Sequence, residues 1–260
     1  MIRLKTQEQI QAMKRGGAIL SAALFKVMQA CVPGAHTDAL DKMLRDEFEK
    51  AGGRPSFLNY KIHTIDPPYP SAICISINDE VVHGPATPDR VIKDGDLVKL
   101  DVGLWYEDMA TDMAATVCVG NVPEVASRLS HETRRALEIA LETIKAGAWI
   151  HDIGKAIEDY LEPKGYGIIR DLVGHGVGYA VHEDPAIPHY HERRARPVKL
   201  KAGMCLAIEP MVTLGNWAIK QKNDGWTIVT ADGSLAAHWE VTVAVTKEGY
   251  ELITPWPDAT

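Results

Sequence analysis

Cysteine is scarce in this chain, and the few cysteines lie far apart. The 260 residues contain only Cys31, Cys74, Cys118 and Cys205, with no Cys-x-x-Cys pair. A secreted disulfide scaffold uses more and closer cysteines, and a thiolate metal site uses paired ones. We therefore expect free thiols in a reducing compartment, the cytoplasm. Cys118 and Cys205 lie in strand-like runs and are expected to be buried.

Long hydrophobic runs and an excess of positive charge are also lacking. No stretch reaches the roughly 18 apolar residues that a membrane-spanning helix requires. Lys26 interrupts the apolar run near the N-terminus, and no clear signal-peptide cleavage site follows it. The formal net charge of -7 argues against a general grip on nucleic acid. The chain is thus expected to bind neither membranes nor nucleic acid.

Three widespread catalytic motifs are missing. The sequence has no His-Glu-x-x-His, no Gly-x-x-x-x-Gly-Lys-Ser/Thr and no Gly-x-Ser-x-Gly. Their absence excludes the commonest zinc proteases, P-loop nucleotide binding and the serine hydrolases with a nucleophile elbow. The composition, 46% apolar and 24% charged, is that of an ordinary globular chain with a large core.

An internal repeat is the strongest pattern that is present. Residues 93–101 align without a gap on residues 201–209: each begins Lys-x-Gly, alternates apolar residues, and ends in an acid, Asp101 or Glu209. Such alternation predicts a strand in both copies. An amphipathic helix pattern follows Gly34 and again follows Gly147. We predict a single α/β domain, residues 1–260, with pseudo-twofold halves at about 1–122 and 123–260.

Each acid-bearing strand is followed by a second acid that opens another apolar run. Asp112 precedes residues 113–119, and Glu240 precedes residues 241–246. A carboxylate among apolar strand residues is costly unless a cation compensates its charge. Four such acids in two related pairs indicate a site for two metal ions where the halves meet. Carboxylates with imidazole and no thiolate suit Mn, Fe, Co or Zn.

Three histidines flanked by glycine or proline lie among these acids. His175 lies within Gly-His-Gly-Val-Gly, His182 begins His-Glu-Asp-Pro, and His83 precedes Gly-Pro. A lone histidine is usually a hydrogen-bonded structural residue, but three in this setting favour a functional role. The other histidines have no such setting and are expected to be surface or structural residues: His36, His63, His131, His151, His189, His191 and His238.

Periodicity and turn residues also predict the order of the elements. Helices are expected at about 6–30, 37–52, 128–146 and 151–163, the first opened by a capping box at residues 6–9. Residues 189–197, rich in charge and flanked by proline, are expected to form a surface segment. Strands are expected at about 71–77, 97–102, 112–119, 167–172, 204–210, 226–230 and 238–246.

In this order and context, the acids and histidines resemble the metal-ligand set of type I methionine aminopeptidases, which have the pita-bread fold. The matching motifs are Leu-Asp-Val-Gly, Gly-His-Gly-Val-Gly, His-Glu-Asp-Pro, Ile-Glu-Pro-Met and Trp-Glu-Val-Thr-Val. The resemblance extends from about residue 5 to residue 255. It implies a mixed α/β (α+β) fold in which a curved antiparallel sheet is covered by helices.

The resemblance also implies a role for each ligand. Asp101 would hold one of two divalent ions (Co, Mn, Fe or Zn) and His175 the other. Asp112 and Glu240 would bridge both ions. Glu209 would bind metal and exchange protons with the attacking water.

A substrate site is implied beside these ligands. His83 and His182 would flank the substrate and assist catalysis. Lys61–Pro68 resembles an insertion beside the pocket, so which residues line the pocket is not fixed by the resemblance. The pocket for the methionine side chain would draw on an aromatic and sulfur-bearing set: Phe57, Tyr60, Tyr69, Cys74 and Trp226.

The implied activity is removal of the initiator methionine from nascent polypeptide N-termini, with a preference for a small second residue. Such an enzyme would act in the cytoplasm near the ribosome, as a monomer. Xaa-Pro aminopeptidases and prolidases share the fold and the ligands, but they normally carry an additional N-terminal domain that 260 residues leave no room for. A non-catalytic binding protein of this fold would be expected to lose ligands, and all five are present.

Overall fold

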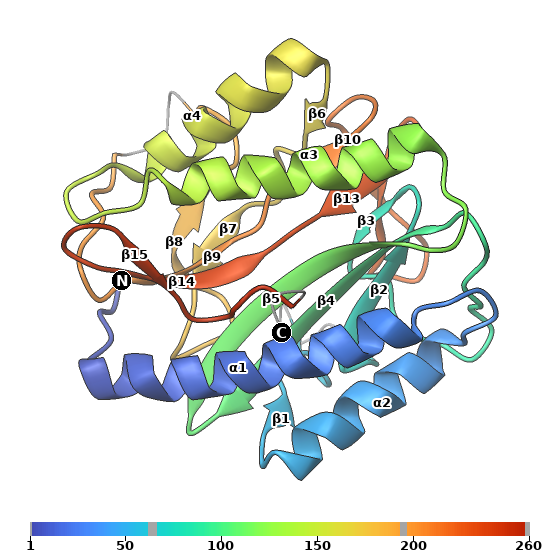
Figure 1. Ribbon diagram of the computed structural model, residues 1–260, viewed down its shortest axis with the longest axis horizontal. Helices are drawn as coiled ribbons and strands as arrows, with labels where there is room; N and C mark the ends of the chain where they lie inside the picture. Colours follow the sequence, from blue (N-terminus) through green and yellow to red (C-terminus); the bar gives the residue numbers. More distant parts are fainter. Residues whose placement is uncertain (1, 62–66, 193–196, 258–260) are drawn as a thin grey trace.

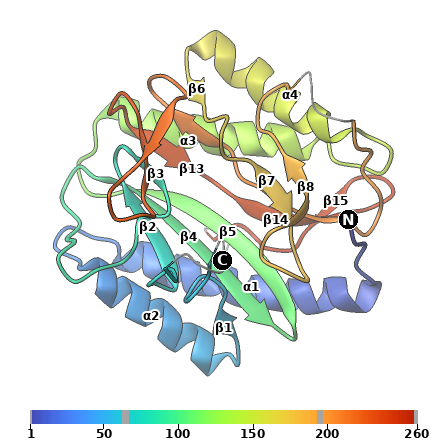
Figure 2. The ribbon, with the colours of Figure 1, turned by 180° about the vertical axis from the view of Figure 1, so that it is seen from behind.

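Helices cover one face of the molecule and strands form the other (Figure 1; Figure 2 shows the strand face). The computed structural model describes residues 2–61, 67–192 and 197–257. Within these residues no helix combines the length and hydrophobicity that crossing a bilayer needs. The helices are α1 (Gln7–Ala30), α2 (Thr37–Lys50), α3 (Glu124–Leu141), α4 (Ile150–Leu161) and a short 3-10 helix, η1 (Glu162–Lys164).

All strand pairs are antiparallel, in two larger and two smaller sheets. The first larger sheet contains β1 (Arg54–Pro55), β2 (Ile73–Ile77), β4 (Leu97–Tyr106) and β5 (Met109–Cys118). The second contains β7 (Gly174–Gly176), β8 (Glu183–Ile187), β9 (Cys205–Ile208), β14 (Val241–Val245) and β15 (Tyr250–Leu252). The smaller sheets contain β3 (Glu80–Val82), β11 (Ile219–Gln221) and β12 (Ile228–Thr230), and β6 (Gly167–Ile168), β10 (Met211–Thr213) and β13 (Ala236–His238).

The two larger sheets meet along a seam between β5 and the start of β14. The backbone N–H of Glu240 donates to Ala114 O at 2.9 Å, and the two residues form an antiparallel bridge. One step further, the Thr242 hydroxyl donates to Asp112 O at 2.8 Å and accepts the Asp112 N–H at 3.1 Å. Backbone segments far apart in the sequence are therefore fixed side by side where the acids lie.

Alternation along β4 separates the core from the cavity. Val98, Leu100 and Val102 belong to the same fully buried cluster as Leu24 of α1, and α1 packs on β4 and β5. Asp101 lies between them in sequence and points to the opposite face, because successive strand residues alternate sides. The helices thus cover the apolar face and leave the acid-bearing face to form the site.

The Lys-x-Gly motif of the repeat is a turn that needs glycine. Gly95 and Gly203 have φ of 88° and 91°, a left-handed conformation that side chains disfavour. In the first turn Asp96 N–H donates to Lys93 O, and in the second Met204 N–H donates to Lys201 O. The same turn therefore precedes β4 and β9. The division of the chain into two duplicated halves stays a prediction.

Several predicted element boundaries need correction. The capping box is confirmed: Gln9 N–H donates to Thr6 Oγ1 at 3.2 Å and Thr6 N–H to Gln9 Oε1 at 2.9 Å. The helix predicted at 128–146 begins at residue 124 and ends at 141, because hydrogen-bonded turns follow it. The strand predicted at 238–246 is divided into β13 and β14 at the seam, and the one at 167–172 shrinks to β6.

The predicted burial of Cys118 is wrong, whereas Cys205 is buried as expected. Cys118 ends β5 on the same face as Thr116, two residues earlier. Thr116 is covered by β13, since its hydroxyl donates to His238 O at 2.6 Å. Cys118 lies beyond that cover and is exposed. All four cysteines, Cys31, Cys74, Cys118 and Cys205, are free thiols.

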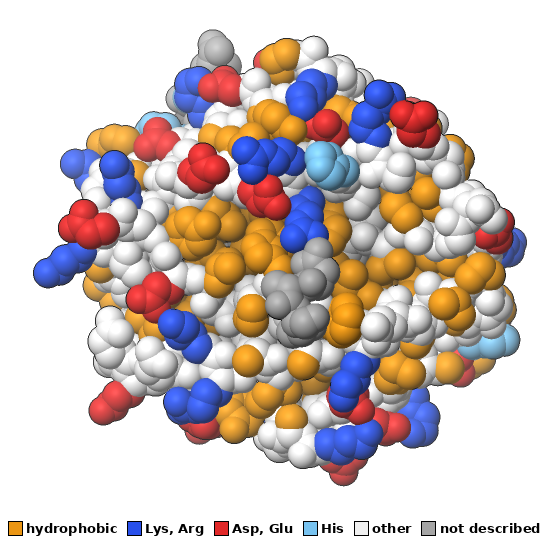
Figure 3. Space-filling model, in the orientation of Figure 1, with side chains coloured by type: hydrophobic (Ala, Val, Ile, Leu, Met, Phe, Trp, Pro, Cys, Tyr) orange, Lys and Arg blue, Asp and Glu red, His pale blue; other side chains and the backbone are white. Residues whose placement is uncertain are grey.

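Surface charge of both signs is interspersed on the helix-bearing face (Figure 3). Surface ion pairs include Lys42–Asp46 at 2.6 Å within α2 and Lys14–Glu251 at 2.9 Å. Exposed pairs of this kind contribute little to stability, because water and salt screen the attraction. The stability of the fold therefore depends on the buried core beneath the helices.

Candidate active site

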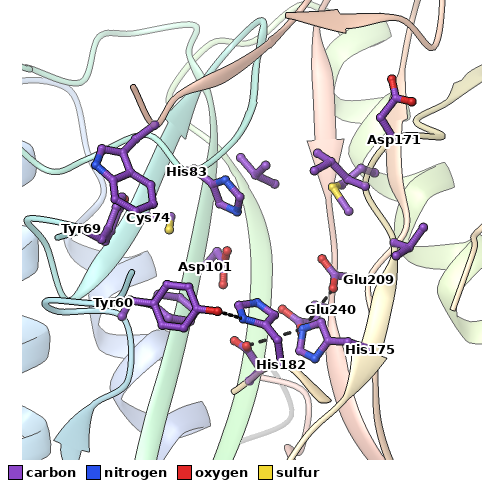
Figure 4. Close-up of a pocket in the computed structure, with 17 residues that line it drawn as sticks. Tyr60, Tyr69, Cys74, His83, Asp101, Asp171, His175, His182, Glu209 and Glu240 are labelled. Carbon is purple, nitrogen blue, oxygen red and sulfur yellow. Dashed lines mark hydrogen bonds and ion pairs between the residues drawn. The ribbon is translucent and has the colours of Figure 1, made fainter. Parts of the chain in front are cut away.

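A cavity of about 350 Å³ opens at the seam between the two larger sheets (Figure 4). Its lining comes from both halves of the chain: the aromatic rings come with His83 and Asp101 from one side, and His175, Glu209 and Glu240 lie across from the rings. Every residue that the sequence analysis placed in the site lines this cavity: Phe57, Tyr60, Tyr69, Cys74, His83, Asp101, Asp112, His175, His182, Glu209, Trp226 and Glu240.

Strand register places three of the acids on one face. Asp101 of β4 pairs with Ala114 of β5, and Ala114 in turn pairs with Glu240 across the seam. Residues in register on neighbouring strands point to the same side of a sheet, and so do residues two apart in one strand. Asp112, two residues before Ala114, therefore joins Asp101 and Glu240 on the cavity face.

His175 and Glu209 enter from the second sheet. His175 of β7 pairs with Ala207 of β9, and Glu209 directly follows β9. His175 Nε2 lies 3.4 Å from Glu209 Oε1 and 4.0 Å from Asp112 Oδ2. Its Nδ1 lies 3.0 Å from Gly176 O. A proton donated there leaves the Nε2 lone pair facing the acids, the orientation usual for a metal-binding histidine.

The potential ligand atoms are close enough to share ions. Three groups of side chains each bring their potential ligand atoms close together. Asp112 and Glu240 each belong to one group with Asp101 and to another group with His175. Both acids therefore lie between Asp101 and His175, which is the arrangement that bridging requires. Within each of three groups all ligand atoms lie within 4.8 Å of one another: Asp101–Asp112–Glu240, His175–Glu209–Glu240 and Asp112–His175–His182.

Burial leaves these acids poorly stabilised as carboxylates. Removal from water raises the pKa of Asp101 to about 7 and that of Glu209 to about 8. Burial and repulsion by neighbouring acids raise the pKa of Asp112 and of Glu240 well above the usual range. Glu240 Oε1 is buried with no hydrogen-bond partner among the described residues. A divalent cation would satisfy this oxygen and stabilise the ionised acids, so the residues fit a metal centre.

Burial also keeps the site histidines uncharged. It lowers the pKa of His83 and of His175 to about 4, and the pKa of His182 to about 3. A neutral imidazole can bind a metal through its lone pair or donate its one N–H to a substrate. His83 has a φ of 61°, a left-handed conformation that is uncommon outside glycine and clusters at functional sites.

His182 stands between the acids and the aromatic wall. Its Nδ1 lies 2.8 Å from the Tyr60 hydroxyl, and its ring centroid lies 4.5 Å from that of His175. A ligand atom of His182 also lies within 4.8 Å of those of Asp112 and His175. This geometry fits a metal ligand as well as a substrate-binding residue. The sequence predicts only the role of a substrate-binding residue for His182, and that role stays a prediction.

The aromatic wall lies across the cavity from Glu209 and Glu240 (Figure 4). The rings of Tyr69 and Trp226 meet edge to face, with centroids 5.1 Å apart. The Tyr69 hydroxyl donates to Gly84 O at 3.0 Å, which fixes the ring against the loop after His83. A methionine thioether is polarizable and packs favourably against aromatic rings held in this way.

Five lining residues were missed by the sequence analysis. Met211 follows Glu209 by two residues, so the alternation that marked the acid also marks Met211. Residues 171–173 lie in an irregular segment before Gly-His-Gly, where no periodicity applies. The missed residues are Val82, Asp171, Leu172, Val173 and Met211.

Two buried histidines contact Glu209 from behind the cavity. His189 is fully buried, and its Nε2 accepts the Glu209 N–H at 3.2 Å. The prediction that a surface segment begins at residue 189 is wrong for His189. This residue lies just after β8, and β8 is part of the second sheet, so His189 is buried there. His238 Nε2 lies 3.5 Å from Glu209 Oε2. His238 could have been found by alternation, since it precedes Glu240 by two residues; no local pattern marks His189.

The remaining histidines do not line the cavity. His36 and His131 are exposed, and His151 and His191 are half-buried. His63 lies outside the described residues, as do residues 62–66 of the predicted insertion.

Comparison with known proteins decides the family. Residues 11–247 match metallopeptidase family M24. The chain belongs to this family. A relative from Aquifex aeolicus, named methionine aminopeptidase, is 41% identical over 254 residues, which are 97% of this chain and 98% of that protein.

Solved structures of two kinds of peptidase resemble this chain to different degrees. The crystal structure of methionine aminopeptidase from Thermotoga maritima has a TM-score of 0.92 and 41% identity, covering 98% of this chain and 99% of that one. The Xaa-Pro dipeptidase from Bacillus anthracis has a TM-score of 0.76 and 25% identity, covering 96% of this chain but 61% of that one. The predicted pita-bread fold, with antiparallel sheets and covering helices, is confirmed.

Proposed function

We propose that this chain is a metal-dependent methionine aminopeptidase, which hydrolyses the first peptide bond of chains that begin with methionine. The observation that carries the proposal is the cavity itself, in which an aromatic wall faces a cluster of buried acids. The wall accepts an unbranched apolar side chain, and the acids attract a free α-ammonium group. Full-length similarity to methionine aminopeptidases supports the same function.

The chain's own ligands would hold two divalent ions. Asp101 would bind one and His175 the other, with Asp112 and Glu240 shared and Glu209 as a further ligand. Ions bound there would polarise the scissile carbonyl and lower the pKa of a water, so that the water could act as a nucleophile near neutral pH. The choice among Co, Mn, Fe and Zn depends on supply in the cell, since this ligand set accepts each of them.

Glu209 and two histidines would carry the proton and hydrogen-bond steps. The Glu209 carboxylate would accept a proton from water as the water oxygen bonds to the scissile carbonyl carbon. It would return that proton to the amide nitrogen as the C–N bond breaks, which releases methionine and a shortened peptide. His83 and His182 would donate hydrogen bonds to the substrate from the two sides of Asp101, above and below it in Figure 4.

The substrate class follows from the same contacts. Phe57, Tyr60, Tyr69, Cys74 and Trp226 would enclose the methionine side chain, and a formyl group would remove the charge that the acids attract. A small second residue would be preferred, because a bulky one would crowd the mouth of the acid cluster.

We further propose a single catalytic domain that acts as a monomer in the cytoplasm on nascent chains near the ribosome. The shared turn at Gly95 and Gly203 supports two duplicated halves within that domain. The net charge of -7 supports action on peptides without a direct grip on RNA. Light scattering of the purified protein tests the monomer, and a mass of twice the chain would overturn it.

A peptide panel with metal added back tests the main proposal. Metal-stripped enzyme receives each of Co, Mn, Fe and Zn in turn and is offered Met-Ala-x, Leu-Ala-x, Ala-Pro-x and formyl-Met-Ala-x peptides. We expect cleavage of Met-Ala-x alone. Preferential cleavage of Ala-Pro-x would move the chain to the Xaa-Pro branch, and no turnover with any metal would support a non-catalytic binding protein.

A further inference from the structure

A hydrogen bond joins the two sides of the cavity between Tyr60 and His182. The Tyr60 hydroxyl lies 2.8 Å from His182 Nδ1, and the two rings meet edge to face with centroids 5.2 Å apart. The dashed line in Figure 4 shows this contact crossing from the aromatic wall to the imidazole beside the acids. Among the described residues, only Tyr60 is hydrogen-bonded to the His182 ring. Tyr60 therefore controls how this imidazole is presented to a bound peptide.

The backbone is anchored on the Tyr60 side. Tyr60 N–H donates to Phe57 O at 2.8 Å, and Tyr60 O accepts the Tyr69 N–H at 2.8 Å. Asn59 N–H donates to Tyr69 O at 2.9 Å. These bonds tie the segment to the chain that continues into β2, so the phenol is held in a defined place.

The loop that carries His182 is anchored as well. The Glu183 carboxylate accepts the N–H groups of Tyr179 and of Ala180. Its second oxygen lies 2.8 Å from Lys5 Nζ, in an ion pair whose side chains are 2% and 10% exposed. Pulling this loop away would leave a buried charge without its partner, which costs far more than breaking a surface pair, so the pair keeps the loop in place. The Tyr60–His182 bond thus connects two fixed points.

The direction of this bond decides which nitrogen of His182 carries the proton. A neutral imidazole has one N–H donor and one acceptor nitrogen. A phenol is a good donor and a poor acceptor, and an unprotonated imidazole nitrogen is a good acceptor. The bond is therefore best made with the Tyr60 O–H donating to Nδ1, which requires the His182 proton to be on Nε2.

We propose that the Tyr60 hydroxyl selects the Nε2–H tautomer of His182, so that this N–H is offered to the carbonyl oxygen of the methionyl bond. This inference rests on the proposed aminopeptidase function. Tyr60 acts here through His182 and is therefore a positioning residue. Its ring also forms part of the pocket wall. The opposite tautomer would leave an Nε2 lone pair, which suits a metal ligand instead of a donor.

The test is the Tyr60→Phe variant, which keeps the ring and removes the hydroxyl. We expect kcat for Met-Ala-x to fall about tenfold, less than the hundredfold or more for deleting an oxyanion donor outright. KM should change little because the ring remains, and metal content should match wild type. Unchanged kcat, or a loss explained by missing metal, would overturn the proposal.

Nitrogen-15 NMR of labelled histidine gives a readout independent of turnover. The zinc-loaded enzyme is used because zinc is diamagnetic, and the His182→Gln variant assigns the signals. Wild type should show His182 protonated at Nε2, and Tyr60→Phe should show a mixture of tautomers. The control is Tyr69→Phe, which removes a phenol from the same wall without contacting His182, and its His182 signals should match wild type.

In wild type, a His182 that is protonated at Nδ1 would overturn the proposal, because Nε2 would then carry a lone pair available to zinc and would be no donor to the carbonyl. So would a Tyr60→Phe spectrum identical to wild type. Because the tautomer is measured without substrate, these failures are distinct from failure of the proposed function, which would appear as no cleavage of Met-Ala-x by wild type.

Discussion

His238 Nε2 lies 3.5 Å from Oε2 of Glu209, on the side of the carboxylate away from His175. The His238 side chain is buried, and both ring nitrogens are without a hydrogen-bond partner among the described residues. A buried imidazole without hydrogen bonds is costly unless it serves a neighbouring charge. We infer that His238 orients the Glu209 carboxylate once that acid is ionised.

This relationship predicts different results for two substitutions of His238. His238→Leu should lower kcat about tenfold to a hundredfold, because a hydrogen bond to a charged group contributes roughly 1.5–3 kcal/mol. His238→Gln keeps a buried donor and should recover most of that loss. Steady-state kinetics and metal content of both variants check this. Equal losses in the two variants would show that only packing matters.

The shared acids should matter most for metal binding. Asp112→Asn or Glu240→Gln keeps the shape of the side chain but removes a charge that lies between Asp101 and His175. Activity should fall by roughly a thousandfold or more, since the water loses its activation. Metal analysis and turnover of the purified variants are the measurements. Near-normal activity, with wild-type contamination excluded, would contradict a centre of two ions.

Removing His182 should separate chemistry from metal binding. His182→Ala should keep its full metal content and lose about a hundredfold in kcat, the usual cost of one donor to the reacting carbonyl. Elemental analysis decides the outcome, because a ligand atom of His182 also lies within 4.8 Å of those of Asp112 and His175. Loss of one ion per chain would make His182 a ligand.

The aromatic wall predicts a binding effect. Trp226→Ala removes the ring that packs edge to face on Tyr69 at 5.1 Å. KM for Met-Ala-x should rise by about tenfold, in line with the loss of a methionine–aromatic contact and its buried area. Metal content should not change. A variant that cleaves Leu-Ala-x as well as Met-Ala-x, with an unaltered KM, would place the pocket elsewhere.

The raised pKa values predict how the metal-stripped protein depends on pH. Asp101 and Glu209 have folded pKa values of about 7 and about 8, above the roughly 4 of unfolded chains. Between these values each of the two acids binds more protons in the folded state than in the unfolded state, so its contribution to stability falls as pH rises. Each acid contributes at most about 1.4 kcal/mol per pH unit.

Urea unfolding of stripped wild type and stripped Glu209→Gln between about pH 5 and pH 8 measures the contribution of Glu209 as the difference between the two slopes. The comparison is needed because burial lowers the pKa of the histidines in and behind the cavity and of Lys99, which gives a slope of opposite sign that the two proteins share. Glu209→Gln removes one titrating acid, so its stability should fall less with pH than that of wild type. Adding zinc to wild type should remove the contribution of the acids, because bound ions keep them ionised throughout. Equal slopes for wild type and Glu209→Gln would show that Glu209 is already ionised without metal.

Much of the site could be predicted because its residues obey strand alternation. Asp101, Asp112 and Glu240 lie on strands or beside them, and each stood out as an acid among apolar neighbours. Their convergence depends on the register through Ala114, which no local pattern encodes. The repeat predicted that the acids would meet; the structure shows the residue pair at which they do.

The parts that failed depend on contacts between distant segments. His189 precedes a charged stretch and was expected at the surface, yet it is buried against the backbone of Glu209. Cys118 follows the alternation of its strand, but its exposure is set by where the cover from β13 ends. In each case the side chain's environment comes from a segment far away in sequence.

The seam at Ala114 and Glu240 has a consequence for folding. Ions held by Asp101 and Glu240 would tie together segments that are far apart in the chain, in a protein whose cysteines are all free. Such ions bind the folded chain and leave the unfolded one, so they stabilise the fold by mass action, more strongly as the free metal concentration rises above the dissociation constant. The catalytic ions would then also take the part that disulfides play in secreted domains, and starving a cell of metal would weaken the fold together with the activity.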